Sequence, residues 1–174
     1  MSNYCECHLR VNVDDFDNLQ VLEEFVEKAK GENGAIDFNK FIQYPQEWVD
    51  QDKEQEAFQQ MTGKEKDEYL KTHKKPIHAY SDHGYHWCIK NWGTKWNADE
   101  IIIERESNHY ISYVFDTAWT PPLPIILEMS KQFPTLRFEL QYYEMGLAFQ
   151  GEYYYFNGEV IFENSRSYSG TRGG

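Results

Sequence analysis

The sequence predicts an α+β fold in which an antiparallel sheet carries helices on one face. Three observations lead to this prediction: two segments with a strand–helix–strand pattern, a polar helical segment between them, and a two-residue turn near the end of the chain. With 174 residues, 17% of them aromatic, the chain can bury a sizeable core. We therefore expect one domain at residues 1–164 and a tail at 165–174.

The first strand–helix–strand segment begins at Tyr4–Val13, where apolar and polar residues alternate as in a half-buried strand. Asp17 is the expected N-cap of a helix that runs to Lys30 with apolar residues at helical spacing. The apolar residues of Ile36–Ile42 then predict a second strand, which Tyr44-Pro45 closes.

Residues 46–93 are predicted to form a helical insertion. Its first part, residues 46–75, contains eight acids, six bases and few apolar residues, which favours one or two short, solvated helices. An aromatic-rich helix is expected from Ser81, with Asp82 as its N-cap. Gly93 should end this helix with a positive φ angle, because glycine best tolerates the left-handed backbone.

The second strand–helix–strand segment follows the insertion. Ile101–Ile103 and Tyr110–Asp116 predict a hairpin, and Leu136–Tyr143 predicts a further strand. Between them, Thr120 is the expected N-cap of a helix that stops at Pro134. Two such segments folded together give a ferredoxin-like sandwich. The four strands assigned to its sheet are Tyr4–Val13, Ile36–Ile42, Tyr110–Asp116 and Leu136–Tyr143.

A C-terminal hairpin extends this sheet, because Asn157-Gly158 favours a type I′ turn. Its outer strand, Glu159–Phe162, should be a sheet edge with three adjacent apolar residues, and we predict a homodimer built around this hairpin. The alternative is that Ser165–Gly174 or the charged insertion folds over the edge. The expected cross-strand pairs are Phe156 with Glu159, Tyr155 with Val160, Tyr154 with Ile161, and Tyr153 with Phe162.

Composition restricts the partners. The formal net charge of −12 argues against generic nucleic-acid binding, because neutralising phosphates requires basic residues. No apolar run approaches the length of a membrane span, and the segment Met1-Ser2-Asn3-Tyr4 does not resemble a secretory signal. We expect a soluble cytoplasmic protein whose three cysteines are free thiols.

The tryptophans are the main candidate for a binding site. Together with the neighbouring asparagine and lysines, they could form a stacking pocket for a base or nucleotide. Alternatively, they form a shared core under the insertion, in which case Trp87 and Trp119 should be buried in one cluster. The candidate ligand- or partner-binding residues are Trp87, Asn91, Trp92, Lys95, Trp96, Trp119 and Glu144.

Motifs for catalysis and metal binding are weak. The chain has no glycine-rich phosphate loop, nucleophile elbow or zincin motif. Asp116 and Glu144, carboxylates near strand ends, could pair for acid–base chemistry. The Cys5-x-Cys7-His8 segment places its histidine on the face opposite the thiols, so we expect neither a metal nor a cofactor.

Several motifs carry a family resemblance over roughly residues 36–152. Asn91-Trp92-Gly93-Thr94-Lys95-Trp96, Phe115–Pro122, Phe133-Pro134, Tyr143–Gly146 and Phe149–Gly151 resemble the YubB-type ferredoxin-like family, small proteins of phages, plasmids and bacterial genomes. The resemblance implies an origin in a mobile element. The genomic neighbourhood of such proteins further implies a counter-defence role. It supplies no catalytic residue.

Three functional hypotheses follow. The first is a non-catalytic interaction protein that binds and inhibits a host defence factor with its acidic, aromatic-rich surface. The second is a binder or sponge for a nucleotide signal that uses the Trp/Asn/Lys cluster. The third is an enzyme that acts through Glu144 and Asp116.

Overall fold

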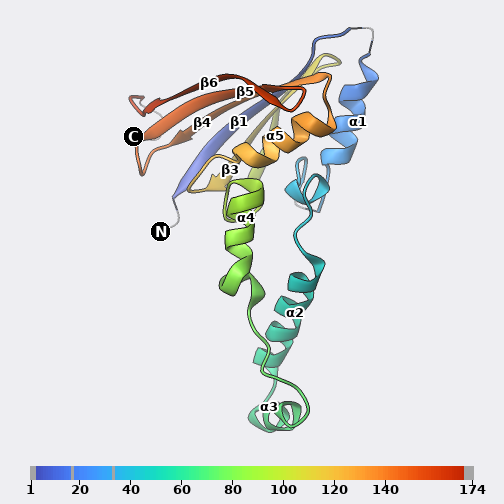
Figure 1. The fold of residues 1–174 in the computed structure, drawn as a ribbon, viewed down its shortest axis with the longest axis vertical. Helices are drawn as coiled ribbons and strands as arrows, with labels where there is room; N and C mark the ends of the chain where they lie inside the picture. Colours follow the sequence, from blue (N-terminus) through green and yellow to red (C-terminus); the bar gives the residue numbers. More distant parts are fainter. Residues whose placement is uncertain (1–2, 17, 33, 171–174) are drawn as a thin grey trace.

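The computed structural model describes residues 3–16, 18–32 and 34–170, so the predicted cap Asp17 lies outside the described residues. A six-stranded antiparallel sheet in the order β2-β3-β1-β4-β5-β6 carries helices on one face, and a helical arm extends away from it (Figure 1). The elements are β1 Tyr4–Val13, α1 Gln20–Ala29, α2 Gln46–Gln60, α3 Gly63–Leu70, α4 Tyr85–Trp92, β2 Asp99–Glu106, β3 Tyr110–Ala118, α5 Leu123–Gln132, β4 Leu136–Glu144, β5 Phe149–Phe156 and β6 Glu159–Ser167.

The strand order β2-β3-β1-β4 confirms the predicted α+β sandwich, although one of the four strands was assigned wrongly. Ile36–Ile42 is not a strand; it contains a single 3₁₀ turn, Phe38–Lys40, in which the Asp37 side chain accepts a hydrogen bond from the Asn39 N–H. Ile36 and Phe38 are fully buried, so their spacing reports core packing and not pairing in the sheet. The second strand of the sandwich is β2, which follows the insertion.

The core lies between the sheet and the helices. In β1 the odd-numbered residues from Cys5 to Val13 are buried, as their alternation predicts. Phe25 of α1 is fully buried and its ring lies 5.3 Å from those of Phe133 and Phe138, in edge-on contacts. Pairs of this geometry add to the stabilisation from burial.

The insertion forms the arm, which we define as residues 46–79. One or two helices were predicted here, and the structure has two, α2 and α3; Thr62 and Glu65 form a capping box at the start of α3. Asp52 accepts a hydrogen bond from the Tyr80 backbone N–H at 3.2 Å and lies 3.2 Å from His78 Nδ1, which ties the two sides of the arm together.

Two predicted helix caps are wrong, and one predicted helix end is confirmed. Asp82 lies inside a π-helical turn, Tyr80–Gly84, that leads directly into α4. Thr120 lies before α5, whose N-cap is Pro122. The Thr120 hydroxyl donates instead to the Gly93 carbonyl at 2.6 Å. Gly93 ends α4 with φ at 87°, as predicted.

The C-terminal hairpin has the predicted turn, with φ at 50° for Asn157 and 73° for Gly158. The two pairs next to the turn are confirmed, but a bulge leaves Ile161 without a partner and shifts the remaining pairs by one residue. Phe162 therefore faces Tyr154, and Glu163 faces Tyr153. The strand also continues to Ser167, so the first part of the predicted tail belongs to β6.

In the part of the chain that the structure describes, every helix is too short or too polar to cross a bilayer.

Candidate functional site

Two sequence motifs meet where the end of α4 crosses the end of β3. Thr94 is fully buried; its hydroxyl accepts a hydrogen bond from the Ala118 N–H at 2.9 Å and donates to the Ala118 carbonyl at 3.0 Å. The Thr120 hydroxyl donates to the Gly93 carbonyl at 2.6 Å. The Asn-Trp-Gly-Thr-Lys-Trp and Thr-Ala-Trp-x-Pro-Pro motifs therefore bind each other, and this contact, which we call the motif junction, fixes α4 to the sheet domain.

An aromatic cluster lies beside this junction and fills the base of the arm. The Trp87 ring lies 5.5 Å from those of Tyr44 and Trp92 and 6.4 Å from that of Trp48. Trp92 is 3% exposed, and its indole N–H donates to the Ile42 carbonyl at 2.8 Å. The indole N–H of Trp92 is thus satisfied within the fold.

The amides of this region are also engaged internally. The Asn91 side chain donates to the Trp87 carbonyl, one helical turn away, at 2.9 Å. The Asn97 side chain accepts from the Phe38 N–H at 2.9 Å and donates to Asp37 at 2.7 Å. Both amides are therefore hydrogen-bonded within the fold.

A pocket of about 230 Å³ opens beside the cluster and is mostly apolar. This volume is below the roughly 300–1,000 Å³ typical of small-molecule sites. The Tyr80 hydroxyl at its wall donates to the Lys95 carbonyl at 2.9 Å, and burial raises the pKa of Tyr44 to about 12. The pocket is lined by Asn39, Tyr44, Val49, Tyr80, Cys88, Trp92, Trp96 and Asn97.

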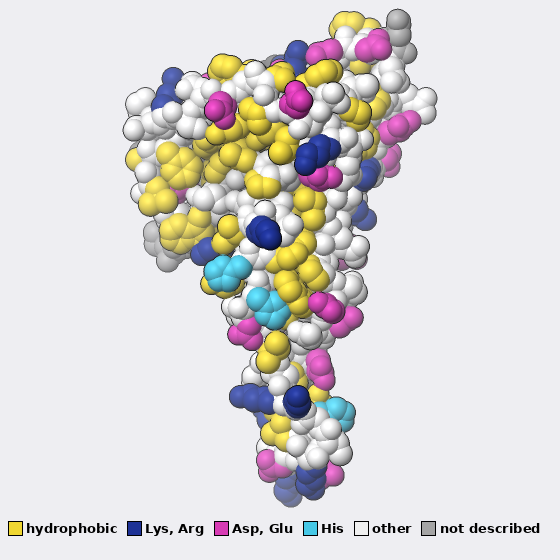
Figure 2. All heavy atoms as spheres, viewed as in Figure 1, with side chains coloured by type: hydrophobic (Ala, Val, Ile, Leu, Met, Phe, Trp, Pro, Cys, Tyr) yellow, Lys and Arg dark blue, Asp and Glu magenta, His cyan; other side chains and the backbone are white. Residues whose placement is uncertain are grey.

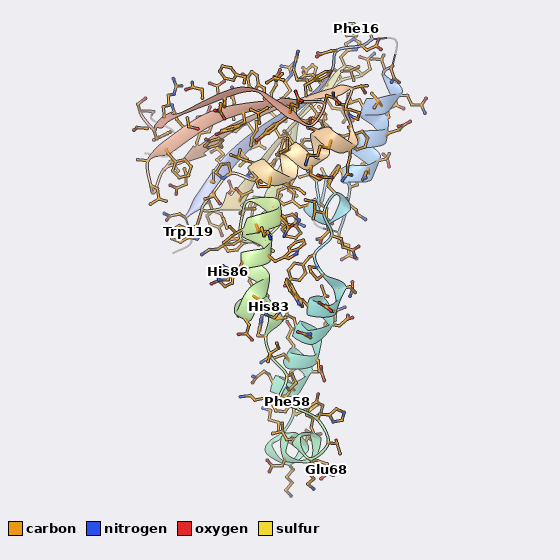
Figure 3. The ribbon with its side chains drawn as sticks, in the orientation of Figure 1. Phe16, Phe58, Glu68, His83, His86 and Trp119 are labelled. Carbon is orange, nitrogen blue, oxygen red and sulfur yellow. The ribbon has the colours of Figure 1, made fainter. Side chains whose placement is uncertain are left out.

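Trp119 does not belong to this cluster. It is partly exposed at the end of the sheet near the N-terminus (Figure 3), and Lys95 Nζ lies 5.0 Å above its ring in a cation–π contact. Trp87 is also only partly buried. The expectation of one buried cluster containing both tryptophans is therefore wrong.

The backbone at Trp119 has φ at 69°, a conformation that bulky residues rarely adopt. We expect Trp119→Gly to be more stable than Trp119→Ala by about 1 kcal/mol, because both lose the same indole contacts and glycine alone removes the cost of the left-handed backbone. Urea unfolding followed by circular dichroism measures the difference. An alanine variant as stable as the glycine variant would contradict this strained backbone.

Glu144 has a structural role in its own turn. Its side chain is fully buried and accepts hydrogen bonds from the Gly146 N–H at 3.1 Å and from the Leu147 N–H. A carboxylate bound in this way holds the β4–β5 turn, as an Asx-type cap would.

Glu144 and Asp116 cannot act together. They lie on strands separated by β1, and Glu144 faces the helices whereas Asp116 lies on the open face of the sheet. Burial, with additional repulsion from Glu6, Asp99 and Glu100, raises the pKa of Asp116. The hypothesis of an acid–base pair formed by these two residues is wrong.

The cysteines and histidines do not converge. Cys5, Cys7 and Cys88 are buried free thiols, and burial raises the pKa of Cys88 to about 12, which leaves it as an unreactive thiol at neutral pH. His8 lies on the other face, with Nε2 at 2.5 Å from Glu6. Among the described residues, no three His, Cys, Asp or Glu side chains form a group that could hold a metal ion.

Comparisons with known proteins agree with this architecture. Residues 91–170 match the family model described as the ferredoxin-like domain in Api92-like protein. The crystal structure of protein Api92 from Yersinia pseudotuberculosis has a TM-score of 0.51 and 12% sequence identity, covering 98% of this chain and 99% of that one. No curated protein sequence matches.

The match to Api92 does not confirm the narrower YubB-type resemblance, and at 12% identity the solved structure supports the fold alone. The family match nevertheless spans the motif junction and the hairpin β5–β6. Residues 91–170 are therefore similar to the ferredoxin-like domain in Api92-like protein.

Proposed function

We propose that this protein is a non-catalytic interaction protein of a mobile genetic element, which binds a host defence factor through the arm. One observation carries the proposal: α2 and α3 extend away from the sheet domain and together bury a single side chain, Phe58 (Figure 3). Ordering a segment of this length costs conformational entropy, and so little burial offsets little of that cost. A contact with another molecule explains why such an arm is kept.

The charge of the arm indicates what kind of partner it fits. Helix α2 carries five acidic residues and one lysine, and Figure 2 shows acidic side chains along the arm above a lysine-bearing tip. Half-buried Trp48, 4.4 Å from the ring of His83, adds apolar surface beside these acids. An acidic helix with an aromatic neighbour is complementary to a basic protein surface, such as that of a host factor that binds nucleic acid. The acidic residues are Glu47, Asp50, Asp52, Glu54 and Glu56.

The mobile-element part of the proposal rests on the YubB-type resemblance of the motifs. The inhibition of a defence factor rests on the genomic neighbourhood that this resemblance implies. The nucleotide-sponge alternative has less support, because the pocket beside the tryptophan cluster is small and the Trp92 indole and the Asn91 and Asn97 amides are hydrogen-bonded within the fold. A rise in melting temperature that grows with nucleotide concentration would favour that alternative.

Charge reversal on the arm tests the proposal. We expect Glu47→Lys/Asp50→Lys/Glu56→Lys to abolish recovery of the host partner in a pull-down from bacterial lysate. In a phage-infection assay, the same variant should no longer inhibit the host's defence. All three residues are exposed. The recovered partner is then identified and titrated as a purified protein against each variant.

The matched control is Glu23→Lys/Glu24→Lys/Glu27→Lys on α1, which are equally exposed and change the net charge by the same +6, from −12 to −6. This variant should keep the partner. Equal loss in both variants would mean that only net charge matters, and full retention in the arm variant would rule out the arm as the contact.

A further inference from the structure

The outer edge of the sheet at β6 is open. All nine residues of this strand are exposed, including Val160, Ile161 and Phe162 at 44%, 53% and 44%. Within residues 3–16, 18–32 and 34–170, the strand pairs with β5 on one side and with no strand on the other, where its backbone N–H and C=O groups are available for pairing. A long edge with adjacent exposed apolar side chains is a template for pairing with another strand.

Neither segment expected to cover this edge does so in the described residues. Ser165–Ser167 are part of β6 itself, paired with β5 through Gly151 to Phe149. The arm points away from β6 (Figure 1).

The opposite edge, β2, differs from β6 in ways that discourage pairing. It contains four acids, Asp99, Glu100, Glu104 and Glu106, and its pairing with β3 is irregular at two places. Strand β6 has two acids and Arg166, and its only irregularity lies close to the turn, which leaves a regular stretch from Phe162 to Ser167. Charges and irregularities are the devices by which proteins block sheet edges.

We propose that two copies of this chain pair antiparallel through β6 and form one continuous sheet across a twofold axis. Directly opposed residues share a face of the sheet, so in a twofold antiparallel pair the central residue faces its own copy. A centre at Glu163 would oppose two carboxylates. A centre at Asn164 places Phe162 against Arg166 of the second copy, twice, which allows a cation–π contact, and places Glu163 against Ser165, so that no like charges are directly opposed.

The net charge of −12 on each copy opposes association, but at 0.15 M ionic strength the Debye length of about 8 Å screens most of it. Measurements therefore belong at that ionic strength or above.

Cross-linking tests the register. We expect Asn164→Cys to form a disulfide-linked dimer under mild oxidation, because opposed residues of an antiparallel pair have Cα atoms about 4.5–5.5 Å apart, within disulfide range. The three native cysteines are buried and do not interfere. Asn108→Cys, exposed in the β2–β3 turn, is the control and should stay monomeric.

Light scattering tests the assembly itself. The wild-type protein should have about twice the 20.8 kDa of one chain at tens of micromolar, and Phe162→Lys should reduce this mass to one chain by placing a cation opposite Arg166. Ile102→Lys, which replaces a 61%-exposed residue on β2, should leave the dimer intact.

Three outcomes would overturn the proposal: a wild-type monomer, a dimer lost in Ile102→Lys but not in Phe162→Lys, or no cross-link through Asn164→Cys. If circular dichroism shows that Phe162→Lys does not fold, the cross-link in the otherwise wild-type chain decides.

Discussion

Replacing Trp92 by alanine is expected to lower the free energy of unfolding by about 3–5 kcal/mol. The side chain is 3% exposed and contacts the rings of Phe38, Tyr44 and Trp87, at 5.9, 6.2 and 5.5 Å between centroids. Its removal leaves a cavity between α4 and the segment after α1, and a carbonyl at Ile42 without its hydrogen bond. Urea unfolding followed by far-ultraviolet circular dichroism measures the loss.

Trp92→Phe separates the two contributions. Phenylalanine keeps much of the ring packing, but its ring is smaller and it cannot donate the 2.8 Å hydrogen bond to the Ile42 carbonyl, so its cost should be about 1–3 kcal/mol. If Trp92→Ala lowers the free energy of unfolding by less than 1 kcal/mol, the cluster is not part of the core. The tryptophans would then again be candidates for ligand binding.

Features encoded within a few neighbouring residues could be predicted from the sequence. The alternation of β1, the Asn157-Gly158 turn and the helix end at Gly93 all depend on local backbone preferences, and the structure confirms each. The segment Ile36–Ile42 shows the limit of this approach, because its apolar spacing specifies burial but not whether the chain pairs with the sheet. The bulge at Ile161 likewise has no local signal that we recognise.

The candidate site was harder to predict. Trp87 and Trp92 contact Tyr44, which lies more than forty residues earlier, and nothing in the local pattern shows that the arm brings these segments together. For Glu144, by contrast, a signal was present: continuing the alternation of β4 places it on the buried face, whereas the alternation of β3 places Asp116 on the open one. The alternation of the two strands therefore places the two carboxylates on opposite faces of the sheet, which excludes the acid–base pair.

Gly93→Ala should destabilise the protein by about 2–5 kcal/mol, because two separate costs add at this position. The backbone there has φ at 87°, and a left-handed conformation costs a residue with a Cβ about 1–2 kcal/mol. A Cβ atom would also lie 2.4 Å from Pro124 Cδ and 3.1 Å from the Leu123 nitrogen, and relieving such overpacking costs about 1–3 kcal/mol. Those neighbours belong to the start of α5 and its proline-rich approach, which cannot move without breaking the motif junction.

Gly63→Ala is the matched control, since its added Cβ would meet nothing within 4 Å and the residue begins α3 without a positive φ angle. It should leave stability unchanged or raise it by about 0.4–1 kcal/mol by restricting the unfolded chain. Guanidinium unfolding of the two variants beside the wild type gives the comparison. Equal stability of Gly93→Ala and Gly63→Ala would mean that α4 can separate from the start of α5 at no cost. The motif junction would then not hold the base of the arm against the sheet domain, and its tightly interlocked residues would require another explanation.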